Sequence, residues 1–211
     1  EISACLVGSE MCIRDRQYLS QANFPTALTG TCRYDNIIQV DTDNEGAAEK
    51  MTTLLIGKGF RRFAFLVKDM SYNVDRKRHE GFCRALIKNG ISEKDQLFYN
   101  GSIRMEFLDA IIENIISKKV ECIICGDDEI CTMVMSRLQA EGYRIPKDVA
   151  IASLYNSTNL DCYSPAVTAV SVAASQMGGT AVRQLIQRLR GENYEKKTML
   201  DYDILFRKST N

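Results

Sequence analysis

The chain has 211 residues, of which 45% are hydrophobic and 26% are charged. This composition is that of a folded globular protein with a sizeable core, and it excludes collagen-like, low-complexity and disordered chains. Its 27 Lys and Arg balance its 27 Asp and Glu, so the formal net charge is zero. A chain that binds nucleic acid by itself is expected to carry a basic excess, because phosphate contacts supply much of the affinity. We therefore do not expect this chain alone to bind DNA.

The cysteines and the apolar segments indicate a cellular location. The eight cysteines lack the regular spacing that is typical of small secreted domains held together by disulfide bonds. No apolar stretch approaches the ~20 residues that span a bilayer. No secretory signal is visible at the N-terminus. We expect a cytoplasmic protein with reduced thiols and no membrane partner.

Residues 1–16 show neither a helical nor an alternating apolar period. The stretch from Leu6 to Asp15 resembles the translation of a common sequencing-library adaptor. On this interpretation residues 1–16 are an artefactual leader that lies outside the fold. The alternative is a genuine irregular leader, and sequencing the locus without that adaptor distinguishes the two.

From residue 43 onward, apolar helices alternate with short β-branched or apolar runs. Helices are predicted at residues 43–57, 75–90, 108–116, 129–141 and 176–190, and strands at 63–67, 96–99, 120–125, 149–154, 167–170 and 200–206. A repeat of about 30 residues indicates parallel βαβ units. Apolar runs without strict alternation fit strands that are covered on both faces. The predicted fold class is α/β, a doubly wound parallel sheet.

Ligands of doubly wound sheets bind beyond the carboxyl ends of the strands. The loops predicted there are residues 68–75, 100–104, 126–128 and 155–158. Their many hydrogen-bonding side chains suit a small polyhydroxylated or anionic ligand. Arg78 follows in the first turns of a helix, and its planar guanidinium group can donate two parallel hydrogen bonds to a carboxylate or to neighbouring hydroxyls. The alternative for any single polar side chain other than Arg78 is that it simply faces water.

Catalytic and metal-binding interpretations have little support. The one histidine, His79, lies in a basic run, and the sequence shows no glycine-rich phosphate loop and no nucleophile elbow. The acidic run 127–129 is better explained by the dipole of a helix N-terminus than by a metal. Cys122 and Cys125 share a C-x-x-C spacing, but in a strand they point to opposite faces, so buried structural cysteines are expected. We predict no catalytic residue, no metal and no cofactor.

Several motifs, taken in their order and spacing, resemble the effector-binding domain of the LacI/GalR transcription repressors. The resemblance runs from about Asn23 to Phe206. It implies a periplasmic-binding-protein-like fold, with two subdomains that open and close on a sugar or a similar small metabolite. The motifs that carry it are Phe24-Pro25, Val40-Asp41-Thr42-Asp43-Asn44, Gly59-Phe60-Arg61-Arg62, Arg78-His79-Glu80-Gly81-Phe82, Cys125-Gly126-Asp127-Asp128, Gly142-Tyr143-Arg144-Ile145-Pro146 and Ser164-Pro165-Ala166-Val167.

The resemblance implies roles for individual residues. Arg78 would contact ligand hydroxyls or a carboxylate, and Asp127 would face the ligand. Ile103 stands where the family commonly has an aromatic residue that stacks on the sugar ring, and Tyr155 replaces an aspartate that often binds the ligand. These two departures are compatible with a different sugar derivative, or with an acidic or phosphorylated effector. We expect Arg78, Asp127 and Tyr155 to lie around one shared hollow, and Arg78→Ala to reduce the effector response with little loss of folding. The set of candidate effector-binding residues is completed by Asp128, Tyr72 and Asn73.

The resemblance also implies a division of the chain. Residues 17–41 and 172–194 would form a partial N-terminal subdomain whose truncated sheet exposes apolar surface. Residues 42–171 and 195–208 would form a complete C-terminal effector-binding subdomain. The helix-turn-helix head and the hinge helix of the family have no counterpart in this sequence. Operator DNA would therefore be bound only through a missing N-terminal domain, in a homodimer.

Three functions stay open at this point. The leading hypothesis is the ligand-sensing domain of a LacI-type transcriptional regulator, which is not an enzyme. The alternative is the solute-binding protein of a sugar transport system, which would predict a secretory signal and fewer free cysteines. The third is a doubly wound enzyme, which would need a phosphate loop or a paired acid and base beyond the strand ends.

Overall fold

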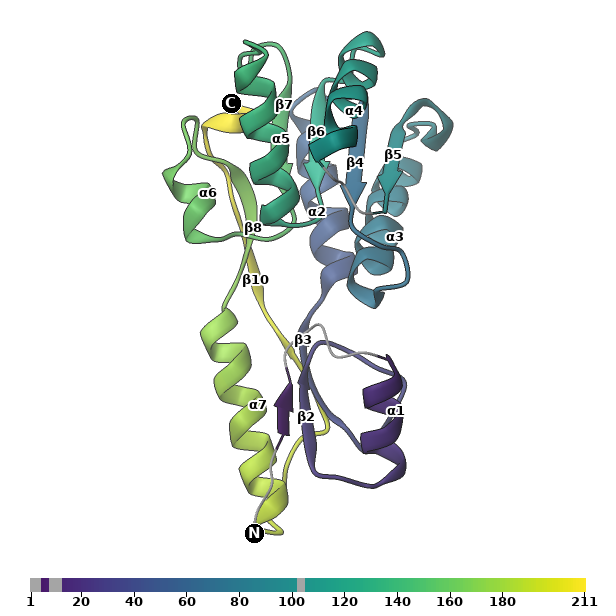
Figure 1. Cartoon of the computed structure of the whole chain (residues 1–211), viewed down its shortest axis with the longest axis vertical. Coiled ribbons are helices and arrows are strands. Elements are labelled where there is room, and N and C mark those ends of the chain that lie inside the picture. The colour runs from purple at the N-terminus through teal and green to yellow at the C-terminus, as the bar shows by residue number, and fades with distance from the viewer. Residues whose placement is uncertain (1–4, 8–12, 102–104) are drawn as a thin grey trace. The chain divides into compact units, whose positions relative to one another are not determined.

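The computed structural model describes residues 5–7, 13–101 and 105–211 of the chain. Two sheets organise it into two compact units (Figure 1). Unit 1 consists of Glu1–Asp43 and Val172–Tyr202, and unit 2 consists of Asn44–Ser171 and Asp203–Asn211. Within the described ranges, no helix is long and apolar enough to cross a membrane.

Unit 1 is built on a four-stranded parallel sheet in the order β1-β2-β3-β9. Its core joins the buried Ala27, Ile38 and Val40 of the sheet to Ala181 and Leu185 of the last long helix. The elements are β1 (Cys5–Val7), α1 (Ile13–Gln21), β2 (Thr26–Thr29), β3 (Ile38–Thr42), α7 (Ala174–Leu189) and β9 (Lys197–Leu200).

Unit 2 is built on a six-stranded sheet in the order β10-β8-β7-β6-β4-β5, in which β5, β4, β6, β7 and β8 run parallel. The strands are β4 (Phe63–Val67), β5 (Leu97–Asn100), β6 (Cys122–Cys125), β7 (Ala150–Ser153), β8 (Thr168–Val172) and β10 (Tyr202–Leu205). The helices are α2 (Asn44–Gly57), α3 (Asn73–Lys88), α4 (Met105–Ser117), α5 (Asp128–Ala140) and α6 (Thr158–Cys162), with short 3₁₀ turns at Glu93–Asp95 and Lys208–Thr210. The predicted α/β class with a parallel sheet is confirmed.

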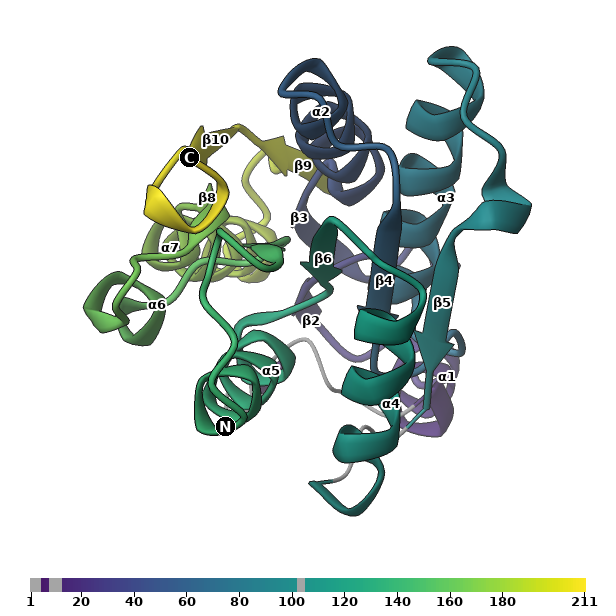
Figure 2. The same cartoon turned by 90° about the horizontal axis from the view of Figure 1, so that it is seen from above.

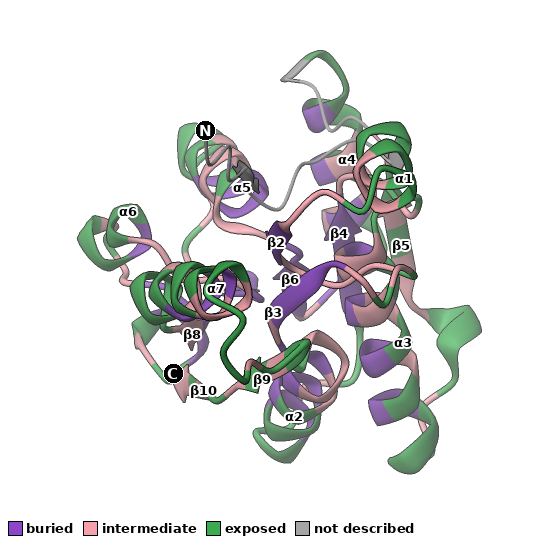
Figure 3. Ribbon diagram, turned by 90° about the horizontal axis from the view of Figure 1, so that it is seen from below, coloured by how far each residue is buried: buried purple, intermediate pink, exposed green. Residues whose placement is uncertain are grey.

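Helices cover both faces of the unit 2 sheet, with α2 and α3 on one face and α4 and α5 on the other (Figure 2). On the first face the ring of Phe65 stacks on Phe82 of α3, with 4.7 Å between the ring centroids. On the second face Leu66 and Ile123 join one cluster with apolar side chains of α4 and α5. Every residue of β4 and β6 is buried, as the burial colours show (Figure 3). Two-sided burial explains why these strands are continuously apolar in sequence.

Cys122 and Cys125 are fully buried free thiols within β6. Burial raises the pKa of both thiols far above the ordinary range, so they are neutral at physiological pH. Neutral buried thiols pack as small apolar side chains. The expectation of structural cysteines on a strand is confirmed.

The last residues of the chain are fastened to the unit 2 sheet by buried hydroxyl groups. The Ser209 hydroxyl accepts from the backbone N–H of Thr168 at 2.8 Å and donates to the Ile151 carbonyl at 2.6 Å. The Thr210 and Thr168 hydroxyls lie 2.7 Å apart. These bonds satisfy polar groups that water does not reach, which is what burial of a hydroxyl requires.

The end of the chain differs from the sequence-based prediction. The one strand expected over residues 200–206 is two strands, β9 and β10, which belong to different sheets. Residues 195–202 therefore lie in unit 1 rather than with the C-terminal subdomain, because β9 pairs with β3. Apolar pattern alone does not say which distant strand supplies the hydrogen-bonding partner.

The described part of the first sixteen residues, 5–7 and 13–16, differs from the expectation of irregular structure, and residues 1–4 and 8–12 lie outside the described residues. Strand β1 pairs in parallel with β2, and α1 begins at Ile13. The adaptor origin of this segment stays a prediction, which the proposed resequencing tests.

Candidate functional site

The loops that follow β4, β5, β6 and β7 open at one edge of the unit 2 sheet, which we call the carboxyl edge. The strands are parallel and in register there, with Val67 opposite Asn100, Leu66 opposite Cys125, and Cys125 opposite Ser153. The prediction that these four loops share one edge is confirmed for the residues that the structure describes.

Arg78 is held at the carboxyl edge in the second turn of α3, with 8% of its surface exposed. Its Nη1 donates to the Gly126 carbonyl at 2.7 Å, and its Nε donates to the side-chain oxygen of Asn44 at 3.2 Å. Gly126 itself packs tightly, since a Cβ there would lie 3.0 Å from Val67 Cγ1 and 3.1 Å from the Leu66 carbonyl. Arg78 thus joins the end of β6 to the start of α2.

Asp75 is a second buried charged group at this edge, one turn before Arg78 on α3. Its Oδ2 accepts from the backbone N–H of Asp69 at 3.0 Å. Burial raises the pKa of the Asp75 carboxyl, and nearby Asp127 adds to the effect, whereas the Asp69 N–H and the Arg78 charge oppose it. The carboxyl therefore anchors the loop after β4 and lies within the field of Arg78.

Asp127 caps the N-terminus of α5, because its Oδ1 accepts from the backbone N–H of Ile130 at 2.9 Å. Its Oδ2 pairs with Lys68 Nζ at 3.0 Å, and the same ammonium lies 2.6 Å from a Glu129 carboxylate oxygen. Partial burial by itself would lower the pKa of Lys68. Its hydrogen bonds to Glu129 and Asp127 outweigh this effect and raise the pKa above the ordinary value. The explanation of the acidic run by a helix N-terminus is confirmed for Asp127.

A hollow of about 300 Å³ opens at the carboxyl edge. Its walls combine the Lys68 and Glu129 charges with the phenol ring of Tyr72, which is 48% exposed. This volume lies at the lower end of small-molecule sites. The hollow is lined by Lys68, Asp69, Tyr72, Gly101, Glu129, Ile130 and Met133.

The structure brings some of the predicted site residues together and not others. Arg78 and Asp127 are neighbours through Gly126, and Tyr72 lines the hollow. Tyr155 follows β7, the strand beside β6, and its backbone is held by the Ser153 hydroxyl, which donates to the Tyr155 carbonyl at 2.6 Å. Neither Arg78, Asp127 nor Tyr155 lines the hollow itself, so one hollow shared by these three side chains stays a prediction.

The three other candidates have different surroundings. Asn73 is the first residue of α3, and its side-chain oxygen accepts from Arg76. Asp128 is the first residue of α5, and its backbone carbonyl accepts from the Thr132 hydroxyl at 2.7 Å. Ile103 lies outside the described residues.

His79 packs among aromatic rings, with its ring centroid 4.2 Å from that of Phe98 and 5.8 Å from that of Phe65. Burial lowers the pKa of this histidine, although the Glu93 and Glu80 charges oppose the shift. A neutral ring among apolar neighbours is what this environment favours.

Sequence reasoning missed Lys68 and Asp75 as site residues. Both carried a signal, since Lys68 directly follows a wholly apolar strand and Asp75 stands three residues before Arg78 on a predicted helix. Residues at this spacing face one another on a helix. What the sequence did not show was that Asp127 and Glu129, at the N-terminus of α5, reach Lys68.

Comparisons with known proteins agree with this architecture. Residues 52–210 match the family model of the periplasmic binding protein-like domain. The chain belongs to this family.

Individual relatives refine the assignment. The HTH-type transcriptional regulator CelR of Thermobifida fusca is 26% identical over 199 residues, which cover 92% of this chain and 58% of that protein. Across the first curated relatives the chain spans between 45% and 60% of their length. The resemblance to LacI-type regulators is confirmed.

Solved structures share the fold. The transcription regulator CcpA of Lactococcus lactis has a TM-score of 0.89 at 24% identity, covering 99% of this chain and 78% of that one. A complex of transcriptional regulator CelR with cellobiose has a TM-score of 0.84 at 25% identity, covering 97% of this chain and 64% of that one.

Proposed function

We propose that this chain is the ligand-sensing domain of a LacI-type transcriptional regulator. In this proposal the carboxyl edge of unit 2 binds a small sugar or sugar derivative, and operator DNA is bound by a separate helix-turn-helix head in a cytoplasmic homodimer. The observation that carries the proposal is the buried Arg78, fixed at the carboxyl edge between Gly126 and Asn44. The complex of the related CelR with cellobiose supports a carbohydrate effector.

The regulator is favoured over the other two functions. Curated relatives of the chain include the HTH-type transcriptional regulator CelR and the HTH-type transcriptional repressor PurR, and both names describe regulators rather than transport proteins or enzymes. We propose no catalytic role, because the charged groups at the carboxyl edge are engaged in helix capping and ion pairs rather than arranged as an acid and a base.

Sensing requires that the ligand bind one arrangement of the domain better than another, because only differential affinity shifts an equilibrium. Three crossings of the chain join the two units, at 43/44, 171/172 and 202/203. A ligand held by loops of unit 2 would bias the conformation of these connections, and through them the DNA-binding heads.

Calorimetric titration with sugars, sugar acids and sugar phosphates, with cellobiose among them, tests the proposal. We expect one class to bind, and Arg78→Ala to weaken that binding by about tenfold or more, because a charge-assisted hydrogen bond is lost. Arg84→Ala is the matched control, since Arg84 lies on the same helix and its side chain is 49% exposed. Equal affinity in the wild type and in Arg78→Ala would remove Arg78 from the site.

The structure changes the expected effect of this substitution on folding. Because Arg78 is buried and donates to the Gly126 carbonyl, its removal leaves a buried acceptor without its partner. We expect Arg78→Ala to lower the free energy of unfolding by about 1–3 kcal/mol, rather than to leave folding nearly unchanged. Titrations are therefore made well below the melting temperature of the variant.

A further inference from the structure

The first crossing between the two units, at 43/44, is a very short connection. Strand β3 of unit 1 ends at Thr42 and helix α2 of unit 2 begins at Asn44, so a single residue, Asp43, lies between them. Thr42 is held in the unit 1 sheet, where it pairs with Leu200 of β9. A connection with so little slack passes a displacement from one end to the other, whereas a long flexible linker would absorb it.

Asn44 joins this crossing to the carboxyl edge. Its side-chain oxygen accepts from Nε of Arg78 at 3.2 Å. The same guanidinium donates from Nη1 to the Gly126 carbonyl at 2.7 Å, between β6 and α5. A side chain that is almost fully buried therefore ties the start of α2 to a loop from which the proposed effector would be bound.

The start of α2 is also packed tightly on α3, the helix that carries Arg78. A Cβ at Gly81 of α3 would collide with the Glu45 carbonyl oxygen, in the first turn of α2. The Arg84 guanidinium of α3 pairs with the Glu45 carboxylate. The two helices therefore move together at this point, and a shift of α3 at the carboxyl edge would reach Asn44 directly.

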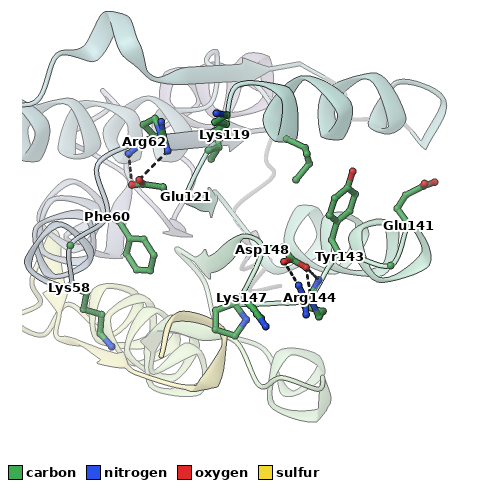
Figure 4. Close-up of a pocket in the computed structure, with 15 residues that line it drawn as sticks. Lys58, Phe60, Arg62, Lys119, Glu121, Glu141, Tyr143, Arg144, Lys147 and Asp148 are labelled. Carbon is green, nitrogen blue, oxygen red and sulfur yellow. Dashed lines mark hydrogen bonds and ion pairs between the residues drawn. The ribbon is translucent and has the colours of Figure 1, made fainter.

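Other arginines of unit 2 are engaged differently. At the opposite end of the sheet, the loops that precede β4, β6 and β7 line a hollow of about 970 Å³ (Figure 4). There Arg62 lies 3.3 Å from a Glu121 carboxylate oxygen, and Arg144 lies 2.8 Å from one of Asp148. These pairs are partly exposed, and neither includes a residue beside a crossing. Arg78 differs because it is buried and reaches such a residue.

We propose that Asn44 passes the occupancy of the carboxyl edge to the crossing at 43/44, as a positioning residue that acts through Arg78. The proposal rests on the function proposed above, because it takes Arg78 as the group that meets the effector. An effector that fixes the guanidinium also fixes its bond to Asn44, and so orders the start of α2. By thermodynamic linkage, a more ordered start of α2 raises the effector affinity by the same factor.

Hydrogen exchange of the whole chain, measured by mass spectrometry on peptides that cover residues 38–48, tests this coupling without any effector. We expect Asn44→Ala to speed exchange there by about tenfold, because a hydrogen bond to a charged group is lost. Asn159→Ala removes the same amide from an exposed position near the start of α6 and should leave this exchange unchanged. If Asn44→Ala also leaves it unchanged, the proposal is wrong.

A double variant separates the coupling from a local effect on the helix end. Asn44→Ala is expected to add nothing in an Arg78→Ala background, since both substitutions remove the same bond. Peptides of β6 in the same samples report opening of the whole unit, so a general loss of stability in Arg78→Ala is measured separately. Single effects that multiply in the double variant would show that Asn44 acts independently of Arg78, which overturns the proposal.

The conservative variant Asn44→Asp provides the rescue. It keeps an acceptor oxygen for Arg78 and adds a charge, so exchange should be as slow as in the wild type or slower. An acidic residue also stabilises a helix N-terminus through the dipole, whatever Arg78 does. Most of the slowing relative to Asn44→Ala is therefore expected to disappear in the Arg78→Ala background. Slowing that persists there in full is a dipole effect and contradicts the proposal.

Cellobiose, one of the sugars in the titration above, is the probe for the effector step. At saturating sugar we expect slower exchange at residues 38–48 in the wild type and no change in Asn44→Ala. Equal slowing in both proteins would overturn the proposal. Absence of cellobiose binding in the calorimeter would instead count against this sugar as effector, and the measurements without effector still decide whether Asn44 and Arg78 are coupled.

Discussion

The buried charges at the carboxyl edge depend on one another. Arg78 and Asp75 lie on the same helix, both are almost fully buried, and each makes hydrogen bonds to loops that follow different strands. Removing either side chain would leave a buried hydrogen-bonding group of a loop without its partner, which is costly. The two residues therefore set the shape of the loops from which a ligand would be bound.

The titration of Asp75 predicts a dependence of stability on pH. Because burial raises the pKa of Asp75 in the folded state, its contribution is full below the ordinary value of 3.8 and is lost as pH rises through the raised value. Asp75→Asn removes this titration. We expect the unfolding free energy of the wild type, minus that of Asp75→Asn, to fall as pH rises from 3.8 toward neutrality.

Urea unfolding of both proteins between pH 4 and pH 7 measures this difference. A tenfold change in the proton affinity of the folded state corresponds to about 1.4 kcal/mol of unfolding free energy. Asp203→Asn, at an exposed position, shows what the loss of one carboxylate does by itself. A difference that stays constant or rises with pH would show that the folded state does not disfavour the Asp75 charge.

At the residue scale, the sequence identified side chains by type and place along the chain. It indicated Arg78 and Asp127 for the same edge, and the structure links both through Gly126. It did not indicate that Lys68 would pair with Asp127. Such a pair depends on two loops that lie about sixty residues apart, and side-chain periodicity carries no information on it.

At the scale of elements, α2 and α3 pack closely because Gly81 lacks a side chain. A Cβ at Gly81 would lie 2.1 Å from the Glu45 carbonyl oxygen and 3.0 Å from the Glu49 backbone nitrogen. Ion pairs of Arg84 and Lys88 with Glu49 cross the same helix pair. These pairs are partly exposed and contribute little, so the close backbone approach is the stronger constraint.

Gly81→Ala is therefore expected to destabilise unit 2 by about 3 kcal/mol, because one of the two helix backbones must shift. Gly57→Ala is the matched control, since Gly57 is the last residue of α2 and no heavy atom lies within 4 Å of a Cβ there. It should be neutral or stabilising by about 0.5–1 kcal/mol. Thermal melting of both variants measures the contrast, and similar melting temperatures would contradict the packing argument.

The helices of unit 2 were the elements best predicted from sequence. Helix α2 begins within a residue of the expected start, and α5 spans nearly the predicted range. The 3.6-residue apolar period is a local property that survives in the folded state. Short strands were less certain at their ends. The division of residues 200–206 between β9 and β10 was missed because only the pairing of β9 with β3 separates the two strands, and such a long-range pairing leaves no local signal.

At the scale of the whole molecule, the two units differ in how much apolar surface they bury. Unit 2 has a continuous cluster that joins its sheet to α4 and α5. The two clusters described in unit 1 are smaller. Large apolar side chains are exposed in both units, and those of unit 1 are Tyr18 of α1, Val182, Ile186 and Leu189 of α7, and Met199 of β9.

Hydrogen exchange should therefore differ between the two sheets. Backbone amides of β2 and β3 are expected to exchange about tenfold or more faster than those of β4, β6 and β7, because local opening is cheaper where fewer apolar contacts are lost. Mass spectrometry of peptides from each sheet measures this. Equal or slower exchange in β2 and β3 would show that unit 1 is stabilised by something other than its apolar core.

The sequence by itself determined the α/β class, the order of helices and strands from residue 43 onward, and the loops that share the carboxyl edge. These follow from local apolar period and from the rule that parallel strands end on one side. Only the tertiary structure decided the partners of Arg78, the sheet that β9 joins, and the residues that line the hollow at the carboxyl edge. Each of these depends on contacts between distant segments, whose choice is governed by packing and hydrogen bonding across the fold rather than by any neighbour in sequence.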